Sequence, residues 1–342
     1  MDGKTLITGG AGFIGVNYAA RCLSRGQKVV IYDNLSRSGA DLNLEWLSDQ
    51  FGRESFTLVK GDVRDADAVK KAAKDAQRIV HLAGQVAVTT SVKDPRTDFE
   101  VNALGTFNTL EAARASGLKP VFVYASTNKV YGGMENVVVE EQKTRYAYKD
   151  LPEGADETQL LDFHSPYGCS KGSGDQYVRD YHRIYGLPTV VLRQSCIYGT
   201  RQFGIEDQGW VAWFIIAAVT GRPITIYGNG KQVRDILFID DLLDAYDLAL
   251  EQPTKSAGQV FNIGGGPKNT ISVWAEFRPM LEKLVGHEIK TQVRDWRPGD
   301  QPVYVSNIGK AQSILGWSPK ITAEEGIRRL YSWIIENRSL FE

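Results

Sequence analysis

The feature that most constrains the fold is a glycine-rich turn near the start of the chain. A short β-branched run, Thr5–Thr8, leads directly into Gly9-Gly10-Ala11-Gly12-Phe13-Ile14-Gly15, and a helical pattern follows. Glycine lets the backbone approach a pyrophosphate, and the amides at a helix start attract anions. The spacing G-x-x-G-x-x-G differs from the G-x-G-x-x-G of typical dehydrogenases, so the turn alone is weak evidence for a nucleotide site.

The rest of the first 200 residues supplies the context that the turn needs. Short apolar runs alternate with helical periodicity, including helical stretches at 102–116 and 165–185. This alternation is typical of a parallel sheet with helices on both faces. The predicted strands are Thr5–Thr8, Lys28–Tyr32, Phe56–Val59, Arg78–His81, Val121–Tyr124 and Thr189–Leu192. We therefore expect an α/β fold of the Rossmann type, a doubly wound parallel sheet.

A predicted cofactor site follows from the carboxyl ends of these strands, where open α/β sheets bind ligands. The Asp33 carboxylate can accept hydrogen bonds from both adenosine ribose hydroxyls and repels a 2′-phosphate, which favours NAD over NADP. Arg37 is an opposing signal, because an arginine can pair with that phosphate. Asp62 could instead cap a helix, a role for which Asp65 competes. The predicted cofactor-binding residues are Gly9, Gly12, Phe13, Ile14, Gly15, Asp33, Asn34, Ser36, Arg37, Asp62, Val63, Leu82, Ala83, Gly84, Tyr167 and Lys171.

The predicted catalytic residues are Thr127, Tyr167 and Lys171. Tyr167 and Lys171 are four apart in a predicted helix and share one face, so the lysine ammonium is expected to lower the pKa of the phenol. Thr127 follows the fifth strand, where its hydroxyl can hydrogen-bond the reacting oxygen. A Tyr-x-x-x-Lys spacing is common on surface helices and Thr127 could be an ordinary strand-end hydroxyl, but their conjunction with the glycine turn and Asp33 favours redox catalysis.

Beyond Gly199 the alternation fades. Helical patterns near 207–220, 240–251, 271–285, 308–315 and 323–337 predict a smaller mixed α/β C-terminal part that binds substrate. The predicted domains are an NAD-binding Rossmann domain over 1–199, with a returning segment near 232–264, and a substrate-binding domain over 200–231 and 265–342. The polar segment 140–158 is expected to form a surface excursion.

Composition excludes several classes of partner. The net charge is −1 and no long basic run occurs, so we expect no nucleic-acid and no membrane partner. The three cysteines, Cys22, Cys169 and Cys196, are too far apart for a disulfide framework or a zinc-ligand pattern. We expect no metal site and a cytoplasmic location.

Together these motifs resemble the extended short-chain dehydrogenase/reductase family, over essentially the whole chain. Its members mostly remodel nucleotide-diphosphate sugars, and the resemblance implies a homodimer or homotetramer. The stretches Tyr227–Asp235, Phe261–Gly265 and Arg297–Asp300 are similar to the family's nucleotide-sugar-binding segments. The substrate-binding residues that the resemblance implies are Gln85, Thr127, Asn128, Gln208, Val211, Tyr227, Arg234 and Arg297, with the two arginines on the diphosphate or ribose.

The reaction can be narrowed from the residues after Thr127. Sugar 4,6-dehydratases of this family carry an Asp-Glu pair there, whereas this chain has Asn128-Lys129, and an amide cannot act as the acid that eliminates water. The strings Ser126–Gly132, Phe163–Gly172 and Gln208–Val211 closely resemble the CDP-tyvelose (CDP-paratose) 2-epimerase group. That resemblance implies an isomerase that inverts C2 of a CDP-hexose through a 2-keto sugar, with NAD held as a prosthetic group and regenerated in each turnover.

Two alternatives stay open at this point. A nucleotide-sugar 4-epimerase of the UDP-hexose type would share the cofactor chemistry and invert C4. A non-catalytic NAD-binding regulator on the same fold would typically lack the tyrosine or the lysine, and both are present here. The nucleotide base and the deoxygenation pattern of the sugar are left open by the residues.

Overall fold

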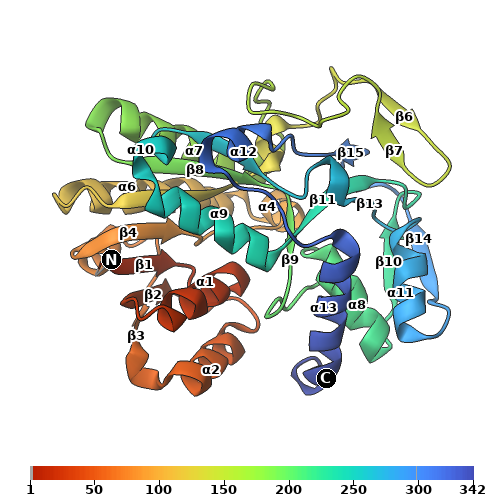
Figure 1. Ribbon diagram of the computed structural model, residues 1–342, viewed down its shortest axis with the longest axis horizontal. Helices are drawn as coiled ribbons and strands as arrows, with labels where there is room; N and C mark the ends of the chain where they lie inside the picture. The colour runs from red at the N-terminus through yellow and green to blue at the C-terminus, as the bar shows by residue number, and fades with distance from the viewer. Residues whose placement is uncertain (1–2, 298) are drawn as a thin grey trace. The chain divides into compact units, whose positions relative to one another are not determined.

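The computed structural model describes residues 3–297 and 299–342; Pro298, within the predicted Arg297–Asp300 stretch, lies outside them. Its main sheet has seven strands in the order β12-β8-β5-β4-β1-β2-β3 (Figure 1). Their bounds are β1 Lys4–Thr8, β2 Val29–Asp33, β3 Phe56–Lys60, β4 Ala76–His81, β5 Val121–Thr127, β8 Thr189–Gln194 and β12 Val260–Ile263. Each predicted strand overlaps one of these, and the order β3-β2-β1-β4-β5 is that of the Rossmann fold, which confirms the predicted class.

Helices connect and cover the strands. They are α1 Phe13–Ser24, α2 Ala40–Phe51, α3 Ala66–Ala73, α4 Val88–Lys93, α5 Pro95–Phe99, α6 Gly105–Ala115, α7 Ser165–Tyr185, α8 Trp210–Thr220, α9 Ile239–Glu251, α10 Pro253–Ser256, α11 Phe277–Val285, α12 Gly309–Leu315 and α13 Ala323–Glu336. A π-helical turn, Glu100–Leu104, joins α5 to α6, so the predicted helix over 102–116 begins in this wider turn.

One helix prediction was wrong at its start. The segment Thr270–Ser272, expected to open a helix over 271–285, is instead the strand β13, and α11 begins only at Phe277. The cause is tertiary, because β13 pairs antiparallel with β11 (Val233–Phe238) and its β-branched residues suit that pairing.

Both faces of the main sheet are buried. Leu6, Ile79 and Phe122 pack in one hydrophobic cluster with residues of α3, α6 and α7. Their strand neighbours Ile7 and Val80 point to the opposite face and are equally inaccessible to solvent. A sheet that is buried on both faces is the reason why its strands are continuously apolar rather than alternating.

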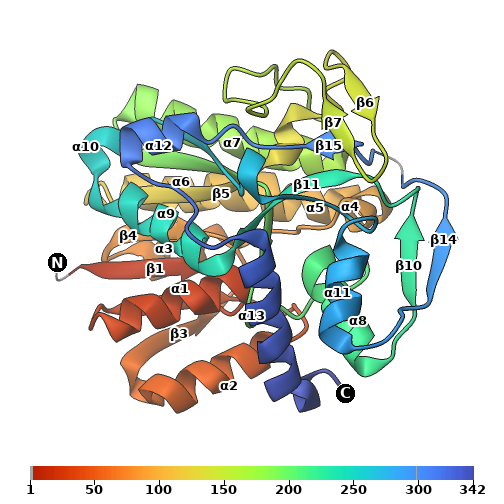
Figure 2. The same ribbon diagram turned by 45° about the vertical axis from the view of Figure 1, so that its right-hand side comes forward.

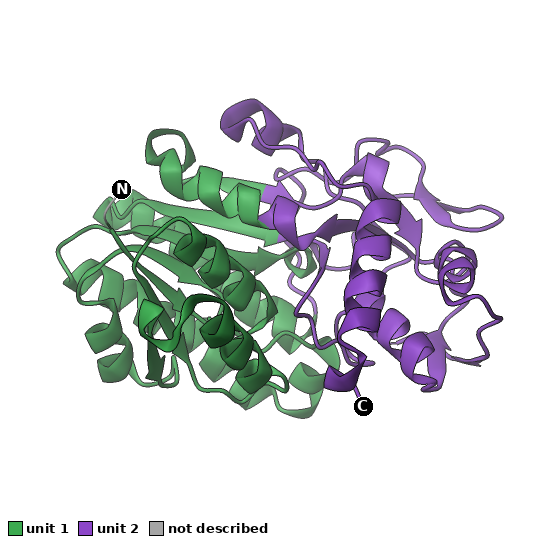
Figure 3. Cartoon of the chain, turned by 60° about the horizontal axis from the view of Figure 1, so that its bottom comes forward, with its two compact units in different colours: residues 1–130, 165–193, 243–261 green, residues 131–164, 194–242, 262–342 purple. Residues whose placement is uncertain are grey.

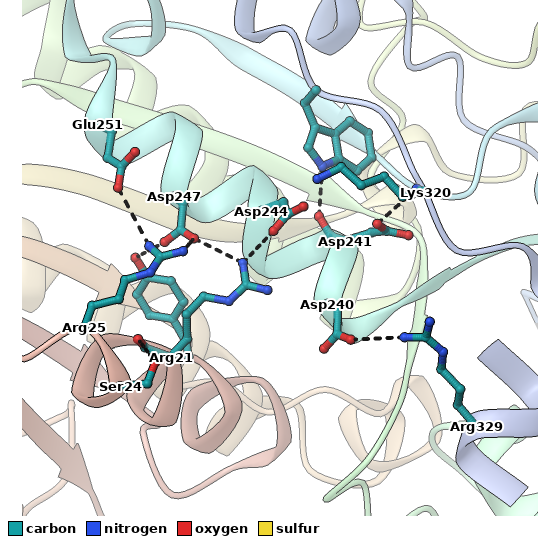
Figure 4. Close-up of polar contacts among 12 residues, drawn as sticks. Arg21, Ser24, Arg25, Asp240, Asp241, Asp244, Asp247, Glu251, Lys320 and Arg329 are labelled. Carbon is teal, nitrogen blue, oxygen red and sulfur yellow. Dashed lines mark hydrogen bonds and ion pairs between the residues drawn. The ribbon is translucent and has the colours of Figure 1, made fainter. Parts of the chain in front are cut away.

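The opposite face is covered in part by α1 and α9, which lie side by side in both views (Figures 1 and 2). Arg21 of α1 bridges two carboxylates of α9, with Nη1 at 2.7 Å from Asp244 and 3.1 Å from Asp247. Arg25 adds a contact of 2.8 Å to Asp247 (Figure 4). These pairs fix a helix from late in the chain against the first helix of the sheet.

The chain divides into two compact units (Figure 3). Unit 1 comprises residues 1–130, 165–193 and 243–261, and unit 2 comprises 131–164, 194–242 and 262–342. Compared with the predicted domains, 131–164 and 194–199 fall in unit 2, and the returning segment near 232–264 is shared between the units.

Unit 2 contains three small sheets. The strands are β9 Cys196–Tyr198, β11, β13 and β15 Val303–Tyr304 in one sheet, β10 Ile224–Tyr227 and β14 Thr291–Arg294 in a second, and β6 Val139–Glu141 and β7 Tyr146–Tyr148 in a hairpin. The hairpin lies in the segment expected to be a surface excursion. Within residues 3–297 and 299–342, none of the helices combines the length and apolar character that crossing a membrane requires.

Candidate active site

The glycine turn lies between β1 and α1, and its glycines differ in the room around them. Gly9 has a φ of +69°, and a Cβ there would lie 2.7 Å from the Ala83 amide nitrogen. At Gly15 a Cβ would collide with the Gly9 carbonyl oxygen. At Gly12, by contrast, the nearest atom would be that same oxygen at 3.3 Å. Gly9 and Gly15 therefore keep the turn tight, and Gly12 presents an open backbone beside the start of α1, where Phe13 and Ile14 are half-buried.

Asp33, the last residue of β2, is bonded to this turn. Its Oδ2 accepts from the Ala11 amide at 2.9 Å, and its Oδ1 accepts from the Leu35 amide at 2.8 Å. Burial raises the pKa of Asp33, and these two bonds oppose the shift. The predicted neighbours Asn34, Ser36 and Arg37 are exposed. The carboxylate is thus held in place by backbone amides at the edge of the turn.

The structure decides which aspartate caps α3. Asp65 is the N-cap and accepts from the Ala68 amide at 3.0 Å, so Asp62 is not needed for capping. Asp62 instead accepts from Arg64 and from Asn34 Nδ2, and Arg64 holds the pKa of Asp62 down to about 2. Asp62 is ionised and half-buried beside Asn34, the residue after Asp33.

The residues after β3 and β4 are tied to the same end of the sheet. Val63 is buried, and its carbonyl accepts from Asn108 Nδ2 at 3.0 Å. The Leu82 amide donates to the Thr8 carbonyl at 3.0 Å, and the Ala83 amide lies 3.3 Å from Thr8 Oγ1. Gly84 follows without a side chain. The structure therefore brings the predicted cofactor residues of β1, β2, β3 and β4 to one sheet edge in unit 1.

Thr127, Tyr167 and Lys171 are all buried in unit 1. Thr127 ends β5, and Tyr167 and Lys171 lie one turn apart in α7. Burial raises the pKa of Tyr167 to about 12; a hydrogen bond with Thr127 opposes this shift, and the charge of Asp98 reinforces it. Thr127 and Tyr167 are therefore in contact, and the phenol keeps its proton at neutral pH.

Lys171 is not among the groups that lower the pKa of the phenol, so this prediction was wrong. Burial lowers the pKa of Lys171 to about 7, against the charges of Asp175 and Asp98. Its ammonium nitrogen lies 4.3 Å from the centre of the Tyr124 ring. The physical reason is that desolvation disfavours the charged form of both the phenol and the amine.

The first turn of α7 is fixed by side-chain hydroxyls. Ser165 has a φ of +67°, and its Oγ accepts from the Gly168 amide at 3.2 Å, as a capping residue does. Ser91, which is fully buried in α4, accepts from the Tyr167 amide at 3.1 Å. A conformation that strains Ser165 is therefore stabilised by contacts that also place Tyr167.

A buried polar network next to this turn was missed by the sequence reasoning. Gln85 was predicted to contact substrate, but its Nε2 donates to Asp98 Oδ1 and to the Ala87 carbonyl, and its Oε1 accepts from the Ala87 amide. Asn102 and Ser170 complete the network through bonds to Asp98. No sequence signal distinguished Asp98 from a solvent-exposed charge, because it lies in the polar stretch Asp94–Glu100.

Asn128 is buried beside Thr127. Its Oδ1 lies 3.3 Å from Thr127 Oγ1, which also accepts from the Lys129 amide at 3.2 Å. The position where a carboxylic acid would be needed for water elimination thus holds an amide that contacts the Thr127 hydroxyl.

The other predicted substrate residues belong to unit 2. Arg234 is buried and pairs with Asp300 at 2.6 Å. Arg297 is half-buried, lies 3.9 Å from the centre of the Tyr227 ring and pairs with Asp207 at 3.1 Å. Val211 is buried in α8, and Gln208 is half-buried with its Oε1 inaccessible and lacking a hydrogen-bond partner. Each arginine already has a carboxylate partner, and a guanidinium has further N–H donors that a phosphate could use.

Comparison with known proteins identifies the family of this chain. The family model described as GDP-mannose 4,6 dehydratase matches residues 6–330. The chain belongs to this family. Membership in this group of extended short-chain dehydrogenases/reductases confirms the family prediction.

Three relatives illustrate the range of the family. A CDP-paratose 2-epimerase of Salmonella typhi is 46% identical over 337 residues, which cover 96% of this chain and 98% of that protein. A UDP-glucose 4-epimerase of Thermotoga maritima, solved with UDP-glucose, is 30% identical with a TM-score of 0.83 and covers 98% and 99% of the two chains. A dTDP-glucose 4,6-dehydratase of Streptomyces venezuelae, solved with NAD, is 28% identical with a TM-score of 0.84 and covers 99% of each chain. Family membership alone therefore leaves three reaction types to be separated.

Proposed function

We propose that this chain is an NAD-dependent nucleotide-sugar epimerase that inverts C2 through a transient 2-keto sugar, with CDP-paratose and CDP-tyvelose or a related CDP-hexose as its substrates. The observation that carries the proposal is the 46% identity to a CDP-paratose 2-epimerase over almost the full length of both chains. The buried group Thr127, Tyr167 and Lys171 supports it with the chemistry that such a reaction requires.

The residues of the glycine turn fit NAD. Gly12 leaves an open backbone at the start of α1, which has no side-chain cap, so the helix amides are available to a pyrophosphate. Asp33 uses one lone pair of each carboxylate oxygen for backbone amides, which leaves the others for the adenosine ribose hydroxyls. Its negative charge disfavours a 2′-phosphate. These features support NAD held by Gly9–Gly15, Asp33 and the segment 82–84.

In the proposed mechanism, NAD held by Gly9–Gly15, Asp33 and the segment 82–84 would supply a reversible hydride acceptor, and its cationic ring would favour ionisation of a nearby phenol. Tyr167 takes the proton of the C2 hydroxyl and gives it back after inversion. Thr127 hydrogen-bonds the reacting oxygen, and the Lys171 amine, one turn along α7, would help to hold the cofactor. Because the phenol is buried with a raised pKa, it becomes a base only when positive charge lies beside it.

The residues after Thr127 disfavour dehydration. Asn128 is buried in contact with the Thr127 hydroxyl, and its amide cannot protonate a leaving hydroxyl group. A redox-neutral inversion needs no such acid, since the hydride removed from C2 returns to C2 and the proton removed from its hydroxyl returns to that oxygen.

A 4-epimerase is the second candidate, favoured by the fold-wide similarity to the UDP-glucose 4-epimerase of Thermotoga maritima. The same three side chains serve inversion at C4 if the sugar is held in another orientation. The two functions differ in which carbon faces Tyr167, so product analysis separates them.

The test is incubation of the purified protein with CDP- and UDP-hexoses, each carrying deuterium at C2 or at C4, followed by NMR of the products. The proposal predicts inversion at C2 of a CDP-hexose with the C2 deuterium retained. Inversion at C4 would select the second candidate, and complete loss of the C2 deuterium to solvent would indicate enolisation and overturn the mechanism. Light scattering of the same preparation tests the proposed homodimer or homotetramer.

A further inference from the structure

The carboxylate of Asp98 has no part in the mechanism above, although it lies in the interior of unit 1. It is fully buried in α5. Its Oδ1 accepts from Gln85 Nε2 at 2.8 Å and from Asn102 Nδ2 at 3.1 Å, and its Oδ2 accepts from Ser170 Oγ at 2.5 Å. Burial raises the pKa of Asp98, and the hydrogen bonds from Ser170, Gln85 and Asn102 oppose the shift because they favour the ionised form.

The network reaches both proposed catalytic side chains. Ser170 lies between Tyr167 and Lys171 in α7, and its Oγ is also 3.2 Å from the Tyr167 carbonyl oxygen. Asn102, in the π-helical turn, donates to Ser170 Oγ at 3.1 Å as well as to Asp98. Turns of this kind occur frequently at functional sites. Asp98 is thus bonded directly and through Asn102 to the turn of α7 that carries the pair.

The same network borders the proposed cofactor segment. Asn102 Oδ1 accepts from the Gln85 amide at 2.9 Å. A Cβ placed on Gly84 would lie 2.9 Å from Asn102 Oδ1 and 3.9 Å from Lys171 Nζ. Gly84, Asn102 and Lys171 are therefore neighbours, and the backbone at 84 is positioned by the residue that also bonds Asp98.

Charged or polarisable groups from four elements, α5, α7, β5 and β4, lie around Lys171. Asp98 of α5 and Asp175 of α7 are the carboxylates that favour its ammonium, and Asp175 is already paired with Arg193 of β8 at 2.9 Å. Tyr124 of β5 offers its ring to the ammonium. His81 of β4 also lies near, but burial and the charge of Lys171 lower its pKa to about 3, so it is neutral. The charge of Asp175 favours the Lys171 ammonium more than that of Asp98 does, but Asp175 is paired with Arg193, whereas Asp98 is hydrogen-bonded by the neutral side chains of Gln85, Asn102 and Ser170.

We propose that Asp98 is a positioning residue for the Tyr167–Lys171 pair: its carboxylate anchors the α7 turn through Ser170 and supplies the negative charge that balances the Lys171 ammonium. The catalytic part of this inference rests on the proposed function. The electrostatic part does not, because it concerns only the charges of Asp98 and Lys171.

The first experiment is a double-mutant cycle in urea with Asp98→Asn and Lys171→Met, at pH 6 and at pH 9.5. At pH 6, Asp98→Asn should destabilise the wild-type background more than the Lys171→Met background, since it leaves a buried ammonium unbalanced. The difference should shrink at pH 9.5, where Lys171 is neutral. Equal destabilisation in both backgrounds at both pH values would overturn the proposal. Asp94→Asn is the matched control, because Asp94 is an exposed cap of the same helix.

The second experiment is the pH profile of kcat for Asp98→Asn on the substrate found by the deuterium assay. Removing a nearby negative charge lowers the pKa of both Tyr167 and Lys171, so the whole profile should move to lower pH by about one unit. A drop in kcat with an unmoved profile would show a merely structural role and contradict the proposal. If no sugar is epimerised, the proposed function fails, but the double-mutant cycle in urea still measures the coupling between Asp98 and Lys171.

A milder variant covers the case in which Asp98→Asn does not fold. Ser170→Ala removes one donor to Asp98 and should lower kcat severalfold with KM unchanged. Ser173→Ala, whose hydroxyl bonds only the Cys169 carbonyl on the same helix, is its control. A kcat for Ser170→Ala equal to that of the control would overturn the anchoring role.

Discussion

The two units hold their candidate residues in opposite ways. In unit 1, Thr127, Tyr167 and Lys171 are buried, Tyr167 is hydrogen-bonded with Thr127, and the amine of Lys171 lies over the Tyr124 ring. In unit 2, Arg234 and Arg297 are paired with the carboxylates Asp300 and Asp207. The difference teaches that the proposed chemistry rests on buried side chains within unit 1, whereas the proposed phosphate contacts rest on arginines held in ion pairs.

This contrast has an energetic basis. Fixed hydroxyl and amine groups in a dry site need no rearrangement during the reaction, which is where electrostatic catalysis gains most. An arginine that is already paired with a carboxylate is not left as an unpaired buried charge. Substitutions in unit 1 are therefore expected to act on kcat, and those in unit 2 on KM.

The largest effect is expected from Tyr167→Phe. Losing the proton acceptor should lower kcat by about 10²- to 10⁴-fold. NAD should stay bound, since the phenyl ring of the new residue still fills the buried site of the tyrosine ring. Product NMR measures the loss of kcat, and the NAD content of the purified protein shows whether NAD stays bound. Tyr177→Phe, half-exposed on the same helix, is the control and should keep full activity. An active Tyr167→Phe would remove unit 1 as the place of the chemistry.

The next effect separates two glycines of the same turn. Gly15→Ala places a Cβ against the Gly9 carbonyl and should lower both the melting temperature and the NAD content. Gly12→Ala meets only one atom at 3.3 Å, so it should fold normally and lose NAD alone. Differential scanning calorimetry and absorbance of released NAD test the pair. Equal melting temperatures for both variants would contradict the assigned packing role of Gly15.

Smaller effects are expected in unit 2. Arg234→Gln and Arg297→Gln should each raise KM for the nucleotide sugar by about tenfold, the value of one charge-assisted hydrogen bond, with kcat little changed. Arg278→Gln, which breaks surface pairs with Glu282 and Glu288 in the same unit, is the control. A fall in kcat with constant KM would show that these arginines act on the reaction itself and would erase the contrast between the units.

The smallest effect concerns stability and pH. The pKa of Lys171 is about 7 in the folded protein against an ordinary value of 10.5, so between these values the unfolded chain holds a proton that the folded protein has released. Stability contributed by this group therefore rises from pH 7 to pH 10.5. Lys171→Met should flatten that rise in urea titrations and stabilise the protein most below pH 7. An unchanged slope would mean that Lys171 is not desolvated as its burial indicates.

Much of unit 1 could be predicted from the sequence because its signals are local. The glycine turn, Asp33 at a strand end and the Tyr167–Lys171 spacing each follow from a few neighbouring residues, and the structure places them on the expected elements. Thr127 likewise ends β5, as the apolar run before it indicated.

What the sequence did not predict depends on contacts between distant segments. The role of Asp98 depends on Gln85 and Ser170, which are 13 and 72 residues away. The pKa of Tyr167 follows from how deeply it is buried, which spacing along a helix does not reveal. The strand β13 exists because β11 pairs with it, and the competing helical pattern was the stronger local signal.

The division of the chain also bears on how such a protein can be altered as a whole. The chain passes from one unit to the other after residues 130, 164, 193, 242 and 261. Neither unit is encoded by a continuous stretch, so no single cut releases one of them intact, and a chimera built at one junction would mix halves of both. Exchange of sugar specificity between relatives must therefore proceed by replacing several short segments at once or by point substitutions within a retained framework.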